Sequence, residues 1–493
     1  MISSKIFREY DIRGVVGEDL TDEAARLIGW AFAVNLLRVN DMSPEDAGEL
    51  KVAIGRDVRL HSEKLCNRLI EGIISTGINV VDVGVCPTPL LYYSLFNIDV
   101  NGGIMITGSH NPPEFNGFKL CVGKESLHGD AVQEIRRIIE DKEKWKKELG
   151  SLKMIGQVEF VPIVEAYLTY IREQFVFDHK PLQPPVKVVV DSGNGTAGVI
   201  APRVLREMGC EVIELYSQPD GRFPNHHPDP TVPENLFDLI KTVKEKGADF
   251  GVAYDGDADR IGVVDENGDI IWGDRLMIIY AKDILKEWPG APVVSEVKAS
   301  QVLYDEIAKA GGEPVMWKAG HSLIKAKMKE IDAVLGGEVS GHIFFADRFF
   351  GYDDAIYATC RLVEILKRER YRSPKRGVSF LLENVAVTYT TPEIRVSCPD
   401  EEKFQVVDKV QETLTTGQIP SSVKPLQIKD IITVDGVRVL FEHGWGLIRP
   451  SNTQPVLVLR YEADSEERLT EIRTFMEGVL KATASASLQQ PLS

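Results

Sequence analysis

The chain has 493 residues, of which 43% are hydrophobic and 27% are charged, an ordinary composition for a globular protein. At roughly 100–200 residues per domain, this length predicts three or four domains. The formal net charge of -17 disfavours nucleic acid as a partner, because phosphate backbones are bound by clustered Lys and Arg. A small anionic substrate fits only where local cations overcome the negative field.

Six cysteines are scattered along the chain without a CxxC spacing, so they indicate neither a zinc site nor a disulfide framework. We expect buried thiols in a reducing cytosol at Cys66, Cys86, Cys121, Cys210, Cys360 and Cys398. The first residues, MISSKIFREYDIRG, lack the apolar segment of a signal peptide. No later stretch reaches the roughly 18 apolar residues that a membrane span needs. We therefore expect a cytoplasmic protein without a membrane partner.

Short Val- and Ile-rich runs alternate with helical segments, a pattern typical of parallel α/β architecture with crossover helices. Three stretches follow this plan, each as strand, helix and strand. The expected elements cover residues 51–55, 62–75 and 79–84, then 186–193, 196–208 and 211–216, and finally 292–297, 301–309 and 313–317. One α/β plan thus recurs three times along the chain.

After about residue 376 the pattern changes to antiparallel strands with two amphipathic helices. The expected strands cover residues 383–391, 430–442 and 456–463, and the expected helices cover 400–414 and 465–481. Pro and Gly cluster near residues 150, 181–185, 288–292 and 373–374. We expect similar mixed α/β domains over residues 1–153, 154–263 and 264–374, and an α+β domain over 375–493 that ends in a frayed polar tail.

The first loop that could carry chemistry is TGSHNPPEFNGFK, residues 107–119, which follows the apolar strand GGIMI. It places Ser109 and His110 at the carboxyl end of a strand, where open α/β sheets bind ligands. The motif is no GxSxG elbow, so acyl transfer has no support. An ordinary loop rich in Ser, Asn and Pro is the alternative interpretation.

The second loop is DGDADR, residues 255–260, after another apolar strand. Asp255, Asp257 and Asp259 can turn toward one point and bind a hard cation through oxygen. With Glu266 they match the spacing of a calcium-binding EF-hand, but Arg260 stands where that loop needs Gly, and we expect flanking strands. Three ligands on one short loop leave coordination positions open, which favours Mg²⁺.

The third loop is GGEVSGH, residues 336–342. Glu338, Ser340 and His342 alternate as on one face of an extended segment. They offer a carboxylate, a hydroxyl and an imidazole to a polyol such as a sugar. A hydrogen-bonded loop with a structural histidine is the alternative.

The fourth loop belongs to RPSNTQPVLVLR, residues 449–460. A guanidinium fork, hydroxyls and backbone amides can surround a phosphate monoester here. The groups come from Arg449, Ser451, Asn452 and Thr453. A polar hairpin before a core strand is the alternative.

One further motif favours a different function. GNGTAG, residues 193–198, follows a strand and opens a helix, and Glu214 lies about 20 residues on, as in dinucleotide-binding proteins. A nicotinamide dehydrogenase is therefore a rival hypothesis. It would leave the other four loops without a common purpose, and close packing of helix on strand also explains these glycines.

Taken together, these four loops in this order resemble the α-D-phosphohexomutase superfamily, and are similar to its phosphomannomutase/phosphoglucomutase branch. The resemblance covers residues 5 to 480 and implies four domains around a central cleft. It implies that Ser109 is phosphorylated and binds Mg²⁺ together with Asp255, Asp257 and Asp259. It further implies catalytic roles for Ser109, His110, Lys119, Arg13, Arg260 and His342. The residues implied to contact substrate are Tyr10, Lys298, His321, Glu338, Ser340, His342, Arg449, Ser451, Asn452 and Thr453.

The sequence departs from the commonest patterns of this family at a few positions, for example Gly108, where Ala is usual, and Ala319, where Thr is frequent. The resemblance implies a mutase that interconverts the 1- and 6-phosphates of mannose or glucose, with glucose 1,6-bisphosphate as activator. His342, His321 and Lys119 all stay open as the general base. The alternatives are a sugar-phosphate phosphatase and a non-catalytic sugar-phosphate binding protein. We expect hexose phosphates as partners and a monomer or small homo-oligomer.

Overall fold

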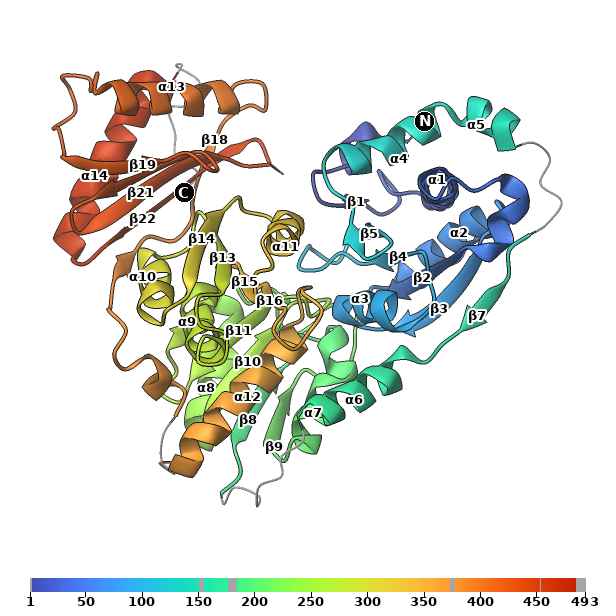
Figure 1. The fold of residues 1–493 in the computed structure, drawn as a ribbon, viewed down its shortest axis with the longest axis horizontal. Helices are drawn as coiled ribbons and strands as arrows, with labels where there is room; N and C mark the ends of the chain where they lie inside the picture. Colours follow the sequence, from blue (N-terminus) through green and yellow to red (C-terminus); the bar gives the residue numbers. More distant parts are fainter. Residues whose placement is uncertain (1, 150–154, 176–183, 373–376, 453, 485–493) are drawn as a thin grey trace. The chain divides into compact units, whose positions relative to one another are not determined.

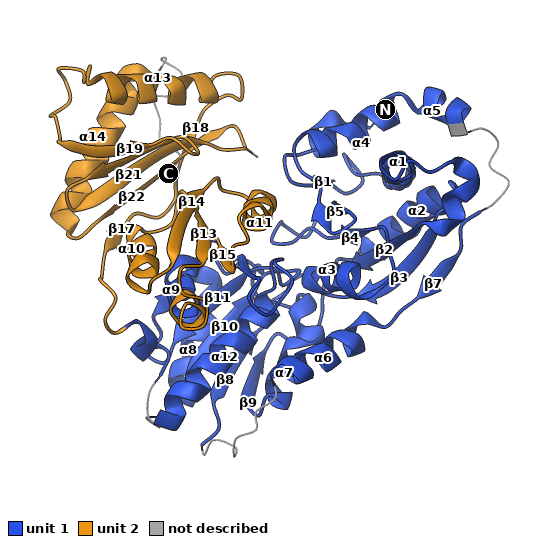
Figure 2. Cartoon of the chain, viewed as in Figure 1, with its two compact units in different colours: residues 1–280, 340–382 blue, residues 281–339, 383–493 orange. Residues whose placement is uncertain are grey.

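The computed structural model describes residues 2–149, 155–175, 184–372, 377–452 and 454–484, and Figure 1 traces its elements in chain order. The chain forms two compact units (Figure 2). Unit 1 comprises residues 1–280 and 340–382, and unit 2 comprises residues 281–339 and 383–493. Neither unit is continuous in sequence, because the chain passes between them three times.

The first sheet of unit 1 carries the first candidate loop. Its strand order is β1 (Ile12–Val15), β5 (Phe115–Val122), β4 (Gly102–Ile106), β2 (Lys51–Arg56), β3 (Asn79–Val85) and β7 (Val158–Phe160), with β6 (Glu125–Ser126) paired to β5. Strands β2, β3, β4 and β7 run parallel, whereas β5 is antiparallel to both β4 and β1. The associated helices are α1 (Asp22–Val39), α2 (Ser62–Ile74), α3 (Thr88–Asn97), α4 (Asp130–Glu140), α5 (Lys142–Leu149) and α6 (Ile163–Gln174), with short 3₁₀ turns at Ser4–Ile6 and Pro44–Glu49.

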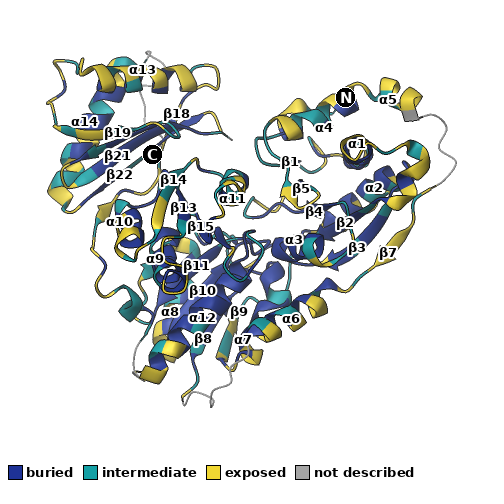
Figure 3. Cartoon of the chain, in the orientation of Figure 1, coloured by how far each residue is buried: buried dark blue, intermediate teal, exposed yellow. Residues whose placement is uncertain are grey.

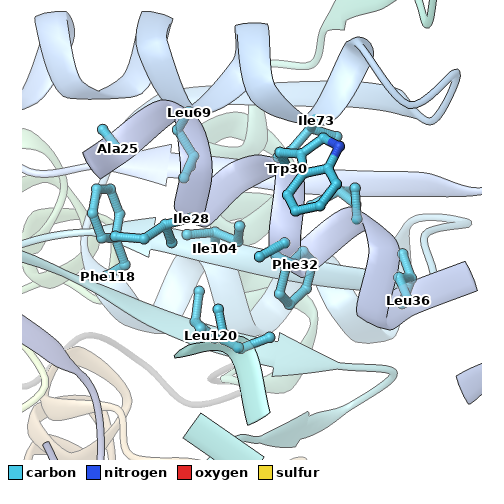
Figure 4. Packing of buried hydrophobic residues seen from close by; sticks show 14 of the residues in the cluster. Ala25, Ile28, Trp30, Phe32, Leu36, Leu69, Ile73, Ile104, Phe118 and Leu120 are labelled. Carbon is cyan, nitrogen blue, oxygen red and sulfur yellow. The ribbon is translucent and has the colours of Figure 1, made fainter. Parts of the chain in front are cut away.

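The core of this sheet forms where α1 packs on the strands. Figure 4 shows Ile28 and Phe32 of α1 beside Ile104 of β4 and Phe118 of β5. Thr21 is the N-cap of helix α1, and its hydroxyl accepts a hydrogen bond from Ala24 N at 3.2 Å, as N-cap residues do. Apolar residues on several sides of α1 are buried, because α1 also packs against α2 and α4.

The second sheet of unit 1 carries the acidic loop. Its order is β12 (Ile270–Ile271), β11 (Ile261–Asp265), β10 (Phe250–Tyr254), β8 (Lys187–Asp191) and β9 (Glu211–Leu215). The associated helices are α7 (Ala201–Glu207), α8 (Phe237–Lys246) and α12 (Ala355–Arg372), and β16 (Ile343–Phe345) also lies in unit 1. Short 3₁₀ turns cover Pro233–Leu236 and Ser379–Leu382. All residues of β4, β10 and β11 are buried, and Figure 3 shows these strands in dark blue.

Unit 2 contains a parallel group of strands and an antiparallel sheet. The parallel strands are β13 (Pro292–Glu296), β14 (Glu313–Trp317) and β15 (Leu335–Gly337), with α10 (Gln301–Lys309) and α11 (His321–Glu330). The antiparallel sheet has the order β17 (Tyr389–Thr390), β22 (Val456–Ala463), β21 (Gly444–Pro450), β20 (Val437–Phe441) and β19 (Ile428–Ile432), and β18 (Ile394–Ser397) also pairs with β22. Helices α13 (Lys403–Thr416) and α14 (Glu466–Thr483) pack on it, and α9 (Gly273–Ile284) spans the change of unit at residue 280.

The predicted order of three α/β segments and a C-terminal α+β segment is confirmed, but three elements differ. The strand expected over 430–442 is instead two antiparallel strands, β19 and β20, joined by residues 433–436. The helix expected over 196–208 is a 3₁₀ turn, Thr196–Val199, followed by α7. Pro202, in the first turn of α7, suits a helix start because it has no N–H to donate. The strand expected over 383–391 is reduced to β17, since the preceding residues form the connection to unit 2 and Val387 is 82% exposed.

The six cysteines are free and buried, as expected, and burial raises the pKa of Cys66 and of Cys86 to about 12. Among the helices formed by the described residues, none combines the length and apolar character needed to cross a membrane. The expected tail falls mainly on residues 485–493, outside the described residues.

The contact between α1 and α2 generates a prediction about stability. A methyl group at Gly29 would lie 2.2 Å from the carbonyl oxygen of Leu69, far inside contact distance. Gly29→Ala should therefore lower the free energy of unfolding of this part of the chain by about 1–3 kcal/mol, measured by urea or thermal denaturation. Gly48→Ala is the matched control, because no atom lies within 4 Å of its added methyl group. Equal stability of the two variants would contradict the packing argument.

Candidate functional site

Ser109 lies in the turn directly after β4, at the carboxyl end of that strand, as predicted. Its hydroxyl donates a 2.6 Å hydrogen bond to Asp255 Oδ2 of the acidic loop. The same Oγ lies 3.2 Å from His110 Nδ1. The first two candidate loops therefore meet at this serine.

The acidic loop connects β10 to β11, so strands flank it and the EF-hand interpretation is wrong. The side chains of Asp255, Asp257 and Asp259 are fully buried, and each offers an oxygen within 4.8 Å of the others. The turn closes through a hydrogen bond from Ala258 N to the Asp255 carbonyl, with Ala258 in the left-handed region at φ 58°. Three carboxylates thus converge on one point inside the protein.

A lysine of β5 offsets part of this negative charge, and a threonine of α3 donates a hydrogen bond to one of the carboxylates. Lys119 Nζ contacts Asp257 at 3.1 Å and also pairs closely with Asp259. Thr88, the first residue of α3, donates from Oγ1 to Asp257 Oδ2 at 2.5 Å. Burial alone would lower the pKa of Lys119, but the two carboxylates raise it well above its ordinary value. Lys119 is therefore a fixed cation at neutral pH.

The remaining carboxylate oxygens fit a metal ion. Burial and the neighbouring aspartates raise the pKa of Asp255, whereas Lys119 lowers that of Asp257 against the effect of its burial. Oδ1 of Asp257 and Oδ1 of Asp259 are buried, and neither has a hydrogen-bond partner within the part of the chain that the structure describes. Buried carboxylate oxygens of this kind are ligands for a hard divalent cation. The group could hold a metal.

His342 lies beside the same aspartates in unit 1. Its Nδ1 is 3.0 Å from Asp353 Oδ2, and its Nε2 accepts a 3.0 Å hydrogen bond from Arg260 Nε. A carboxylate therefore lies next to Nδ1 of the ring, and Arg260 lies next to Nε2. Asp259, His342 and Asp353 form a second group that could hold a metal.

Two further predicted residues of unit 1 surround Ser109. Arg13 Nη1 donates to the carbonyl of Gly108 at 2.7 Å and to Asn111 Oδ1 at 2.6 Å, so it contacts the loop itself. Desolvation, followed by the charges of Arg260 and Arg13, lowers the pKa of His110 well below its ordinary value. His110 is therefore neutral. Tyr10 lies in the bend before β1, half-buried.

The GNGTAG segment, residues 193–198, packs against the acidic loop. Thr196 donates from its backbone N and from Oγ1 to the carbonyl of Gly256, at 3.0 and 3.2 Å. A side chain at Gly195 would lie 2.7 Å from the same oxygen. Close packing, rather than dinucleotide binding, accounts for these glycines.

In unit 2, Lys298 lies between two carboxylates. Its Nζ is 3.3 Å from both Glu296 Oε2 and Glu393 Oε2. Burial acts against charge on Lys298, but these carboxylates raise its pKa, and the pKa of Glu393 is lowered to about 2 by Lys298 and Arg395 despite burial. Arg438 holds the flanking carbonyls of Val297 and Ala299, at 2.5 and 2.7 Å.

Arg449 forms the centre of the fourth candidate loop, the hairpin between β21 and β22. Its Nε and Nη2 both lie 3.0 Å from Asp435 Oδ2, which also accepts a hydrogen bond from Ala319 N at 3.0 Å. Ser451 is buried and Asn452 is half-buried in this hairpin, whereas Thr453 lies outside the described residues. Arg449, Ser451 and Asn452 lie at the β21–β22 hairpin, and phosphate binding by them stays a prediction.

The third loop differs from its prediction. Residues 338–342 form a turn with Gly341 at φ 95°, not an extended segment, because β15 ends at Gly337. Glu338 belongs to unit 2 and accepts a hydrogen bond from Gly320 N at 2.8 Å, next to His321 at the start of α11. Ser340 and His342 belong to unit 1.

Several contact residues of these sites had no distinctive sequence pattern. Thr88 and Asp353 in unit 1, and Glu296 and Asp435 in unit 2, contact predicted residues but lie outside the four motifs. The Tyr-Asp-Asp run at 352–354, next to an aromatic segment, was the one local signal that could have indicated Asp353.

Comparisons with known proteins cover nearly the whole chain. Models of the phosphoglucomutase/phosphomannomutase family match as alpha/beta/alpha domains I, II and III over residues 4–146, 165–268 and 272–384, and as the C-terminal domain over 393–479. The chain is 46% identical over 485 residues to a phosphomannomutase/phosphoglucomutase of Pseudomonas aeruginosa, covering 98% of this chain and 97% of that one. It is 40% identical to a phosphoglucomutase of Neisseria gonorrhoeae, covering 98% of each. A solved structure of a phosphoglucomutase/phosphomannomutase family protein from Burkholderia thailandensis matches with a TM-score of 0.86 at 38% identity, covering 98% of each chain.

The loop that follows β9 generates a prediction about pH. His226 Nε2 lies 3.0 Å from Asp191 Oδ2, and the neighbouring His227 pairs closely with the His110 carbonyl. Burial lowers the pKa of His226, but its hydrogen bond to Asp191 and the carboxylate charge raise it above the ordinary value overall. The stabilisation is therefore complete below the unfolded pKa and is lost as the pH rises through the folded one. Asp191→Asn should lower the pKa of His226 measured by NMR, and its deficit in Tm should be larger at pH 6 than at pH 9.

The control for this prediction is Asp464→Asn, which alters the exposed pair formed with His443 at 2.9 Å. Exposed ion pairs contribute little to stability, so its Tm should stay close to that of the wild type at both pH values. A pH-independent deficit for Asp191→Asn would show that the charge of Asp191 does not stabilise the His226 loop.

Proposed function

Because the chain belongs to the phosphoglucomutase/phosphomannomutase family and is therefore a phosphohexomutase, we propose that it interconverts the 1- and 6-phosphates of mannose and glucose through a phosphorylated Ser109. One observation carries this proposal: the hydroxyl of Ser109 donates at 2.6 Å to Asp255, within the group of buried carboxylates. A phosphoryl group on Ser109 Oγ would therefore start next to a cation site.

We propose Mg²⁺ as the cation, held by Asp255, Asp257 and Asp259 together with the phosphoryl oxygens on Ser109. When bound, Mg²⁺ supplies positive charge that offsets the charge on the transferring group. The chain itself contributes two more cations at this point. Lys119 is fixed by Asp257 and Asp259, and Arg260 follows directly after the loop.

The proposed transfer step needs a base for the sugar hydroxyl. As the bond between Ser109 Oγ and phosphorus breaks, the sugar oxygen forms its bond to phosphorus and its proton moves to His342 Nε2. The oxygen left on Ser109 takes a proton from the Lys119 ammonium, which is held at the acidic loop. Asp353 supports this role because its Oδ2 lies 3.0 Å from Nδ1, where a carboxylate stabilises the ring once it has gained a proton. Arg260 Nε occupies Nε2 before substrate arrives, so it must turn away toward the phosphoryl group. His342 is favoured over Lys119, whose raised pKa keeps it protonated.

We propose that unit 2 binds the rest of the substrate. Arg449, Ser451, Asn452 and Thr453 would hold the phosphate that is not being transferred, and the pair with Asp435 orients the guanidinium of Arg449. Hydroxyl contacts come from Glu338, Lys298 and His321 of unit 2, and from Ser340 and Tyr10 of unit 1. The bisphosphorylated sugar must then turn over before phosphate returns to Ser109, and glucose 1,6-bisphosphate would prime the serine.

Domain limits and location complete the proposal. We keep four domains over residues 1–153, 154–263, 264–374 and 375–493. Two of these limits fall among residues that the structure does not describe, and the limit at residue 263 falls inside β11. The buried free thiols support a cytoplasmic location. A phosphatase or a binding protein is not favoured, because relatives over the full chain are mutases by name.

The reaction can be tested by a coupled assay with Mg²⁺ and a trace of glucose 1,6-bisphosphate. Mannose 1-phosphate and glucose 1-phosphate should be converted to their 6-phosphates, and glucosamine 1-phosphate should react more slowly. Ser109→Ala should remain folded and bind sugar phosphate, but its kcat should fall by at least about 1,000-fold because the covalent route is lost. Steady release of inorganic phosphate would instead indicate a phosphatase, and near-wild-type turnover by Ser109→Ala would exclude the covalent mechanism.

The metal site can be tested through Asp257. Asp257→Asn keeps the shape of the side chain and an acceptor for Thr88, but it removes one of three negative charges. The Mg²⁺ concentration for half-maximal activity should therefore rise about tenfold or more, a loss of about 1.4 kcal/mol in binding. Asp269→Asn, an exposed change in the turn that follows β11, is the control and should leave this concentration unchanged. Equal values for the two variants would remove Asp257 from the metal site.

A further inference from the structure

The backbone of Ser109 has a conformation that needs support. Its φ of 46° lies in the left-handed region, which residues with a side chain rarely adopt unless their surroundings enforce it. The Ser109 amide donates at 2.8 Å to Thr107 Oγ1, but this local bond does not hold the residues that follow. The question is which group fixes the rest of the loop.

Arg59 lies in the segment between β2 and α2, outside the four motifs, and donates hydrogen bonds to several carbonyls of this loop. Its guanidinium is completely buried. Nη2 donates to the carbonyls of Ser109 at 2.8 Å and Asn111 at 2.5 Å, and Nη1 donates to those of Pro112 at 2.6 Å and Phe115 at 3.0 Å. Nε donates to Asp57 Oδ2 at 3.2 Å. All five N–H groups of the guanidinium are therefore used.

Asp57 connects this guanidinium to the other side of the serine. Its Oδ2 accepts from Gly108 N at 3.0 Å, and its Oδ1 accepts from Arg59 N at 3.0 Å and from the Ser62 hydroxyl. The amide before Ser109 and the carbonyl of Ser109 are thus both bound by one Asp–Arg pair. Such a pair limits rotation about the two backbone bonds of the serine.

Gly108 leaves the space that Arg59 fills. A Cβ at position 108 would lie 2.3 Å from Arg59 Nε, so any side chain there would displace the guanidinium. This accounts for the glycine at position 108. The composition of the loop and the position of Arg59 depend on each other.

A loop of the second sheet covers the guanidinium. The ring of Phe223 lies 5.1 Å from Arg59 Cζ, and Phe223 also has a left-handed backbone, with φ 48°. A side chain at Gly221 would lie 2.4 Å from the carbonyl of Val58, so this loop packs directly on the backbone beside Arg59. Exclusion of water strengthens the hydrogen bonds that Arg59 makes.

From these contacts we propose that Arg59 is a positioning residue for Ser109: it holds the serine's backbone in the conformation that points Oγ at the acidic loop. Arg59 itself touches no reacting atom. The inference rests on the proposed role of Ser109 as the phosphorylated residue.

The test compares Arg59→Lys with Arg361→Lys. Lysine keeps the charge but has three donors on one atom and cannot reach four carbonyls at once. Arg361 is a matched control, since it is buried, is 2.8 Å from Asp347, and lies 4.6 Å from the Phe345 ring, but contacts no loop residue from 107 to 116. In each variant, kcat, KM for glucose 1-phosphate, the rate of Ser109 phosphorylation by glucose 1,6-bisphosphate, and hydrogen exchange would be measured.

We expect Arg59→Lys to lower kcat and the phosphorylation rate by about 100-fold, with KM changed less than about threefold and faster exchange at the amides of residues 109–111 and 114–115. Arg361→Lys should lower Tm but keep kcat within about twofold. Wild-type kcat and phosphorylation in Arg59→Lys would overturn the inference. If Arg59→Lys does not fold, Phe223→Leu replaces it and should give the same split between kcat and KM in weaker form; an unchanged kcat in Phe223→Leu would then overturn the inference.

This outcome is separable from failure of the proposed function. If wild-type protein takes no phosphate on Ser109 and Ser109→Ala stays active, the phosphoserine mechanism is wrong, and the positioning role falls with it. If Ser109→Ala is inactive while Arg59→Lys behaves as the wild type, the mechanism stands and the role of Arg59 alone is rejected.

Discussion

Three buried carboxylates next to one serine hydroxyl are the constraint on which the rest of unit 1 depends. Removing charges from water is costly unless they are paired, and Lys119 and Arg260 offset only part of the charge that the three carboxylates carry when ionised. The backbone amides of Asp259 and Arg260 donate to Asp255 Oδ1, at 3.1 and 3.2 Å, and offset part of the excess. The negative charge that remains would favour a bound cation, so the electrostatics of this buried loop suit a metal site.

Much of the fold and of the first two loops could be predicted because the determinants are local. A buried parallel strand is a short apolar run, and its end is marked by Gly and polar residues, such as Thr107 and Gly108 after β4 and Asp255 and Gly256 after β10. The helix at Gln301–Lys309 and the strand at Glu313–Trp317 appear where periodicity placed them. The wrong predictions arose where contacts in the folded chain, rather than the local pattern, determine the structure. One example is the turn at 338–342, where alternating side chains resembled those of a strand.

The supporting residues could not be predicted because they depend on contacts between distant segments. Thr88 and Asp257 are 169 residues apart in the chain, and Arg59 holds a loop about 50 residues away. Asp353 reaches His342 from the segment before α12. A threonine at a helix start or an arginine after a strand is common in any α/β protein, so composition and spacing cannot distinguish these from ordinary residues.

The five residues from Glu338 to His342 are divided between the two compact units, with the change between Val339 and Ser340. Since unit 1 needs residues 340–382 and unit 2 needs residues 281–339, no single cut in the gene yields either unit intact. A gene fragment that encoded one unit would carry only part of this motif. The two parts of the motif, residues 338–339 and 340–342, must therefore stay in one continuous chain. An insertion within this short turn would alter both parts at once.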